Sequence, residues 1–203
     1  MQHPNIDVEA LKNDPEFQEN LKLLEQECKE TQSVAKGYQL LDAYLVIEKD
    51  EESLNELFGF LVNNAFDKLA TYLTEHKSFD VRNNDEERAV ARALYEYGMQ
   101  RYSENDTKGA KEIFLVLHHT VADEELKDAM MVHAAAVMAG NSFENFIDNV
   151  VKLDDVNPAD PLAVFVKDFV QPTDILLEMW KKYVDEGKEE LKVLENEERK
   201  NEG

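Results

Sequence analysis

Apolar side chains recur three and four residues apart along most of this chain, and this spacing constrains its fold more than any other feature. The clearest run comprises Leu54, Leu57, Phe58, Leu61, Ala65, Leu69, Tyr72 and Leu73. Residues with this spacing share one face of an α-helix but not one face of a strand. Alternation of apolar and polar residues never extends beyond a few positions with turn signals on both sides. We therefore expect an all-α fold.

Capping residues, Gly and Pro mark the expected ends of these helices. We expect one bent helix or two helices between Pro15 and about Ile47, and a helix capped by Asp50 after them. Residues 76–85, "HKSFDVRNND", are expected to form a loop. The later helices are expected to start at Asp85, Asp106, Asp123, Ser142 and Thr173.

The stretch between Asp160 and Pro172 carries mixed signals. It contains a β-branched apolar run, "LAVFV". However, Asp160 followed by Pro161 is a good helix start, and Pro172 cannot continue a helix. We therefore expect a short helix over residues 162–170.

Four regions follow from these elements. They are a flexible lead-in (1–14), an N-terminal helical region (15–80), a helical array (85–186) and a charged C-terminal tail (187–203). The tail follows Gly187 and is so rich in charge that we expect it to fray in solution.

Composition limits the classes of partner. The net charge of −22 repels nucleic-acid phosphates and anionic lipid, so we expect no nucleic-acid partner. No apolar run approaches the roughly 18 residues of a membrane span, and no secretory signal is visible. The single Cys28 cannot form an internal disulfide. These features predict a cytoplasmic acidic protein without membrane insertion.

No catalytic or metal-binding motif is recognisable. His118 and His119 lie near Asp123 and Glu124, but strong zinc signals need spaced pairs of His or Cys. Acidic pairs are frequent because 44 residues are Asp or Glu. We predict no enzymatic activity, no catalytic residue, no metal ligand and no cofactor. An enzyme whose site no motif encodes stays open as an alternative.

Two stretches share an order of large and small residues that is typical of paired helices. The first contains Leu94, Tyr97, Gly98, Tyr102, Ala110, Phe114 and Leu117, and the second contains Met130, His133, Ala134, Val137, Phe146, Val150 and Leu153. Ala110 of the first stretch and Phe146 of the second are 36 positions apart. Small residues let one helix pack closely on its partner, and the aromatic residues fill the space around them.

This pattern resembles the tetratricopeptide repeat, whose helix pairs recur about every 34 residues. The resemblance covers one well-matched unit (about 92–121), one degenerate unit (about 125–158) and a weak third unit (160–186). Repeats of this kind with an acidic surface and a charged C-terminal helix are loosely similar to small bacterial type III secretion chaperones. In that family, the concave face of the repeats holds an extended apolar segment of a client protein.

The resemblance implies a protein–protein interaction module, either a chaperone or an adaptor in a bacterial secretion or surface-organelle system. Its partner would be a polypeptide with an apolar or basic segment. The inner surface of the repeats would be formed by Tyr95, Met99, Tyr102, Met131, Ala135 and Met138. Methionine adapts to varied apolar shapes, which suits a groove for peptides.

Two other interpretations of these six residues stay open. They would be ordinary core residues if they faced the N-terminal helices. Residues 129–140, "AMMVHAAAVMAG", are apolar nearly all round, so both sides of that helix must be covered. The cover would be the N-terminal helices or a second copy of the chain, and the second copy would make the protein a self-associating structural or regulatory homodimer.

Overall fold

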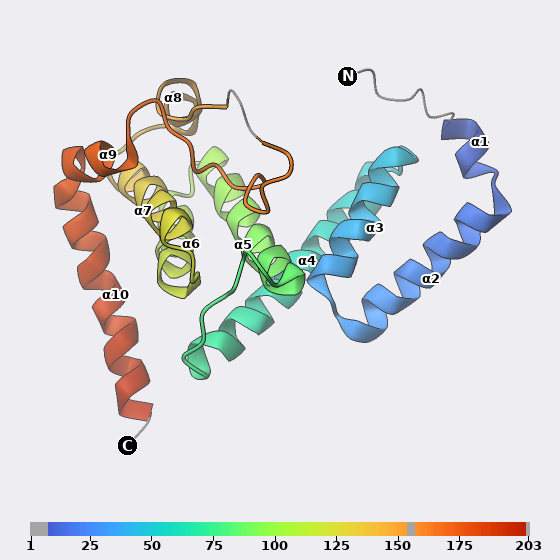
Figure 1. The fold of residues 1–203 in the computed structure, drawn as a ribbon, viewed down its shortest axis with the longest axis horizontal. Helices are drawn as coiled ribbons and strands as arrows, with labels where there is room; N and C mark the ends of the chain where they lie inside the picture. Colours follow the sequence, from blue (N-terminus) through green and yellow to red (C-terminus); the bar gives the residue numbers. More distant parts are fainter. Residues whose placement is uncertain (1–7, 154–156, 202–203) are drawn as a thin grey trace. The chain divides into compact units, whose positions relative to one another are not determined.

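The computed structural model describes residues 8–153 and 157–201, with side chains described as far as Val193. Within these residues the chain forms ten α-helices (Figure 1) and two isolated β-bridges but no strand, which confirms the all-α fold class. The chain divides into two compact units, unit 1 (Met1–Asp67) and unit 2 (Lys68–Gly203). The division falls inside helix α4 (Glu51–Thr74).

Unit 1 contains α1 (Val8–Lys12), α2 (Pro15–Thr31), α3 (Val34–Val46) and most of α4. Of the two arrangements that the sequence allowed before Ile47, two helices is therefore correct. The chain leaves α2 at Gln32, which has a φ of 52°, and Ser33 then caps α3 by accepting a hydrogen bond from the Lys36 N–H. These two residues make a tight turn, so α2 and α3 form a helical hairpin.

The three long helices of unit 1 bury one apolar core. Its buried members are Leu21, Cys28, Leu40, Ile47 and Leu57. Asp50 caps α4 as expected, because its Oδ1 accepts a hydrogen bond of 2.9 Å from the Ser53 N–H. The three-and-four spacing of the apolar residues thus places one face of each helix against its neighbours.

Two glycines of unit 1 predict opposite effects of the same substitution. A Cβ added to Gly37 of α3 would overlap Leu61 Cδ2, whereas a Cβ on Gly59 of α4 would meet nothing within 4 Å. Alanine stabilises a helix interior by about 1 kcal/mol relative to glycine. Overpacking costs about 1–3 kcal/mol, and Leu61 is fully buried with little room to move.

We therefore expect Gly59→Ala to stabilise unit 1 by up to about 1 kcal/mol and Gly37→Ala to destabilise it by about 1–2 kcal/mol. Urea denaturation followed by circular dichroism measures both changes. The close approach of α3 to α4 is contradicted if the two variants shift the midpoint in the same direction.

Unit 2 contains six further helices after the last turns of α4. They are α5 (Asp85–Ser103), α6 (Thr107–Thr120), α7 (Glu124–Met138), α8 (Phe143–Asn149), α9 (Thr173–Met179) and α10 (Lys181–Asn201). Helix α6 packs between α5 and α7, and α9 and α10 both pack against α7 (Figure 1).

Local capping signals account for where several of these helices begin. Asp106 accepts a hydrogen bond from the Gly109 N–H, Asp123 from the Leu126 N–H, and Ser142 from the Asn145 N–H, as the sequence predicts. Helix α5 begins at Asp85 as expected, and its cap is Asn84. Each cap satisfies an N–H that has no partner within the helix.

Gly98 allows α5 to pack closely on α6. A Cβ at Gly98 would lie 3.0 Å from Ile113 and 3.0 Å from Phe114, and Ala110 of α6 is fully buried. The small residues of the first repeat-like stretch therefore lie where the two helices meet. Whether these pairs belong to the tetratricopeptide class stays a prediction.

The expected helix over residues 162–170 is wrong. Residues 161–165 form hydrogen-bonded turns, and the chain is extended only over residues 166–169, which we call the extended segment and where Phe169 forms an antiparallel bridge with Val151. The Lys152 N–H donates to Asp168 O and the Val170 N–H donates to Val150 O, each at 2.9 Å. The third repeat-like unit therefore lacks its first helix.

The expected break and fraying after Gly187 are also wrong for the described residues. Helix α10 runs through Gly187, which is buried, and a Cβ there would lie 2.8 Å from Leu115 Cδ2 of α6. Leu191, one turn further, is also buried. In this helix the glycine permits close packing rather than ending the element. The lead-in is likewise helical at Val8–Lys12, while residues 1–7 lie outside the described residues.

Candidate protein-binding surface

The six residues expected to line a groove lie mostly in the interior of unit 2. Four of them are buried, Tyr95 and Tyr102 on α5 and Met131 and Ala135 on α7. The other two, Met99 on α5 and Met138 on α7, are half-buried. Binding a partner through the four buried side chains would require unit 2 to open.

Helix α7 is covered by elements of its own unit. Helix α6 packs against it, and α9 and α10 pack against it as well. The sequence had left the N-terminal helices and a second copy as the two candidate covers. Unit 2 supplies a third one, because its C-terminal helices bury residues such as Met131.

Tyr95 and His133 link the interior of unit 2 to the extended segment. The Val166 N–H donates to the Tyr95 hydroxyl at 3.2 Å, and the hydroxyl lies 3.3 Å from His133 Nε2. His133 Nδ1 lies 2.8 Å from Ala129 O, which can only accept, so this nitrogen carries the proton and Nε2 accepts from Tyr95. Complete burial lowers the pKa of His133 from 6.5 to about 4. The ring is therefore neutral at pH 7.

An ion network holds the other side of the extended segment. Lys167 Nζ lies 3.0 Å from Glu125 and 3.3 Å from Asp160. Arg82, from the loop before α5, pairs with Asp123, and it lies 3.0 Å from Glu125 and 3.8 Å from Asp160. The network ties the extended segment to the start of α7.

The pKa shifts in this network favour its charged state. The pKa of Asp160 is lowered, first by the hydrogen bond from the Leu162 N–H and further by the charge of Lys167. Burial alone would lower the pKa of Lys167, but its hydrogen bond with Glu125 and the nearby carboxylates raise it. Both side chains therefore stay ionised near neutral pH.

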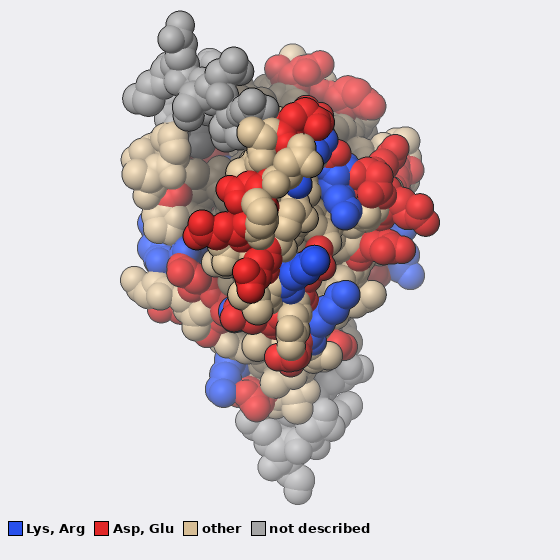
Figure 2. All heavy atoms as spheres, turned by 90° about the vertical axis from the view of Figure 1, so that its right-hand side faces the viewer, with Lys and Arg blue, Asp and Glu red and all other residues tan. Residues whose placement is uncertain are grey.

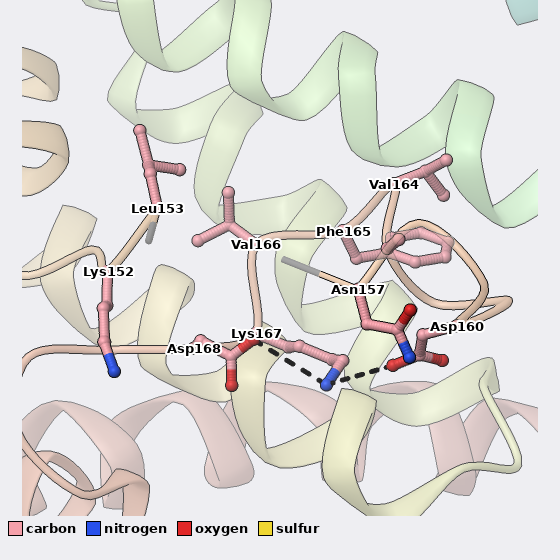
Figure 3. A pocket seen from close by; sticks show the side chains of 10 residues that line it. Lys152, Leu153, Asn157, Asp160, Val164, Phe165, Val166, Lys167 and Asp168 are labelled. Carbon is pink, nitrogen blue, oxygen red and sulfur yellow. Dashed lines mark ion pairs between the residues drawn. The ribbon is translucent and has the colours of Figure 1, made fainter. Parts of the chain in front are cut away.

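A cavity of about 220 Å³ lies beside this segment, and we call it the loop pocket. It is lined by Lys152, Leu153, Asn157, Asp160, Ala163, Val164, Phe165, Val166, Lys167 and Asp168. Figure 3 shows Lys167 reaching between Asp160 and Asp168 on one side, while Leu153 and Val166 extend together on the other. The loop pocket thus has one charged wall and one apolar wall.

The apolar wall reaches the surface. Leu153 is 61% exposed and Val164 is 39% exposed. The helical spacing predicts that Leu153 points inward with Phe146 and that Val164 lies in a helix, and both predictions are wrong. The β-branched run of residues 162–166 gave no reliable signal, because residues 162–165 form turns and only Val166 lies in the extended segment.

Helix α9 presents a second apolar pair at the surface of unit 2. Ile175 is 45% exposed and Met179 is 65% exposed, and they lie one helical turn apart. Asp174 and Glu178 are exposed on the same short helix. Apolar side chains therefore lie next to carboxylates here as well.

The described part of the chain contains neither a metal-binding cluster nor a membrane-spanning helix. No group of three His, Cys, Asp or Glu residues there is arranged to hold a metal ion. His118 instead has its Nδ1 2.8 Å from Lys127 O, so this nitrogen donates to the carbonyl. None of the described helices is long and apolar enough to cross a membrane.

Acidic side chains spread over the face shown in Figure 2, with fewer basic ones among them. This agrees with the net charge of −22.

The chain matches no family model, and it has no significant match among curated proteins or solved structures. A functional assignment must therefore rest on the chemistry of the surface.

Proposed function

We propose that the protein binds a polypeptide partner through the rim of the loop pocket. The observation that carries the proposal is the exposure of Leu153 and Val164 at one pocket of a strongly acidic chain. Apolar side chains grouped at a concave surface mark interaction sites more often than isolated ones do. Burying them against a partner would supply the main favourable free energy of binding.

The surrounding charge selects the partner. A net charge of −22 raises the encounter rate with basic segments and repels acidic ones. The partner segment would therefore carry apolar side chains for the pocket rim and Lys or Arg beside them. A chaperone or adaptor for secreted proteins is the specific form that the repeat-like sequence suggests.

Self-association is the second candidate, favoured by the exposed pair on α9. A second copy could bury Ile175 and Met179, although the like charge of two copies opposes their approach. Light scattering at several concentrations and at high salt, where the repulsion is screened, separates this candidate from a monomer.

The binding proposal is tested by the double variant Leu153→Glu with Val164→Glu. Both side chains are exposed, so the variant should fold, while two new carboxylates on the apolar wall should oppose burial. We expect affinity capture from the source cell to recover a partner with the wild-type chain and to lose it with the variant, a decrease of about tenfold or more in affinity.

Val193→Glu is the matched control. Val193 is also exposed but lies on α10 and does not line the loop pocket. The control should capture the same partner as the wild-type chain. Equal capture of the partner by the double variant would contradict the proposal. Loss of capture with Val193→Glu alone would indicate that the binding surface lies on α10.

A further inference from the structure

Unit 1 contains a separate cavity of about 420 Å³ between α2, α3 and α4. Its lining residues are Glu25, Cys28, Lys29, Leu40, Tyr44, Lys49, Ser53, Glu56, Leu57 and Phe60. Cys28, Leu40 and Leu57 are buried core residues, so the floor is apolar. The rest of the lining is largely polar, with Glu25, Lys29, Lys49, Ser53 and Glu56, and a cavity of this volume can hold a small molecule with an apolar body and a polar head group.

The Tyr44 hydroxyl is already hydrogen-bonded at one side of this cavity. It donates a hydrogen bond of 2.8 Å to Glu25 Oε1. Burial raises the pKa of Tyr44, and the hydrogen bond to Glu25 raises it further, so the phenol stays protonated. The carboxylate of Glu25 thus already has a donor within the protein.

The two lysines at the rim lack such partners. Lys12 and Lys36 of unit 1 pair with carboxylates, Lys36 with Glu27 at 2.6 Å, whereas the exposed Lys22 forms no ion pair among the described residues. Among the described residues, Lys29 and Lys49 form no ion pair, and Lys49 Nζ lies 5.3 Å from the centre of the Tyr44 ring. Neither ammonium group is held by a carboxylate of the described residues, so both can contact an anionic ligand at the rim.

We propose that this cavity binds a small amphiphile with an apolar body and one anionic head group, such as a carboxylate. The apolar body would lie on the floor of Leu40, Leu57 and the Cys28 side chain. The head group would accept charge-assisted hydrogen bonds from Lys29 and Lys49. Glu56 also lies at the rim, and its carboxylate would repel an anionic head group. Removing this charge is therefore a further test.

Decanoate, kept below its micelle concentration, is the probe, and isothermal titration calorimetry on the full chain measures its binding. We expect saturable binding of one decanoate. Decyltrimethylammonium has the same chain and the opposite charge, and it should bind about tenfold more weakly or not at all. Equal binding of the two probes, or no saturable binding of decanoate, overturns the proposal.

Charge variants identify the site. The double variant Lys29→Gln with Lys49→Gln should weaken decanoate binding about tenfold, because both charge-assisted hydrogen bonds are lost. Glu56→Gln should tighten it. The matched controls are Lys22→Gln and Glu52→Gln, which alter exposed residues of α2 and α4 outside the cavity and should change binding little. A site elsewhere is indicated if the control variants have the larger effect.

Cys28 provides a second readout. It is the only cysteine of the chain and lies at the cavity floor, where its residue is 2% exposed. Decanoate should slow its modification by a thiol reagent in the wild-type chain and not in the double lysine variant. Unchanged reactivity at saturating decanoate would place the ligand outside this cavity. A helical peptide that protects Cys28 better than decanoate does would instead assign the cavity to a protein partner.

Discussion

Replacing Phe146 with alanine is expected to destabilise unit 2 by about 3–5 kcal/mol, the range for buried aromatic side chains. The Phe146 side chain is fully buried. Its ring centroid lies 4.9 Å from that of His133, 5.8 Å from that of Tyr102 and 6.4 Å from that of Phe169. The substitution therefore leaves a cavity between α5, α7, α8 and the extended segment.

Phe143→Ala is the matched control on the same helix. Phe143 is half-buried and has one edge-to-face contact with Tyr102, at 5.6 Å between ring centroids. We expect a loss of only about 1–2 kcal/mol for it. Urea denaturation followed by the fluorescence of Trp180, the single tryptophan, reports on unit 2. A loss below about 1 kcal/mol for Phe146→Ala would contradict the packing described here.

Phe146 also shows what the sequence could predict. The spacing of its neighbours correctly placed it on the inner side of a helix, although a small residue is usual at that repeat position. Helix starts were predictable too, because a cap such as Asp106 or Asp123 acts on N–H groups within its own first turn. Signals of this kind are local, so a single sequence reveals them.

The extended segment was not predictable because its partners are distant in sequence. Asp160 does accept a hydrogen bond from the Leu162 N–H, as a helix cap would. The chain nevertheless forms only turns over residues 161–165 and then becomes extended, where the Val166 N–H donates to Tyr95, 71 residues away in sequence, and Phe169 pairs with Val151. Tertiary contacts thus override a valid capping signal.

The candidate sites could not be predicted from the sequence for a related reason. The apolar pattern of α7 shows that both of its sides are covered, but it cannot show which segment covers them. Once α9 and α10 fill that role, Met131 becomes an interior residue, and Phe165 and Val166 likewise cover Tyr95. The cavity of unit 1 likewise depends on three helices, and no motif marks its rim lysines.

The second large effect is a loss of stability at mildly acidic pH caused by His133. In the unfolded chain this histidine should have its ordinary pKa near 6.5, whereas burial lowers the pKa to about 4 in the folded protein. Between these two values the unfolded chain binds a proton that the folded chain does not. The free energy of unfolding must therefore fall as the pH drops through this window.

The size of the effect follows from the same two values. The full difference corresponds to roughly 3 kcal/mol, reached below about pH 4, and about 2 kcal/mol of it should be lost between pH 7.5 and pH 5. No charged group offsets this change by contact. The ring is enclosed by Tyr95, Phe114, Phe146 and Phe169.

A comparison with His133→Gln isolates the histidine, because contributions from the many carboxylates are common to both proteins. Glutamine does not titrate and can still form hydrogen bonds in place of the ring. We expect the difference in unfolding free energy between pH 7.5 and pH 5, followed by Trp180 fluorescence, to be about 2 kcal/mol smaller in the variant. Equal differences would mean that His133 gains its proton in the folded state as readily as in the unfolded one, and an NMR titration of its ring would then show a pKa near 6.5.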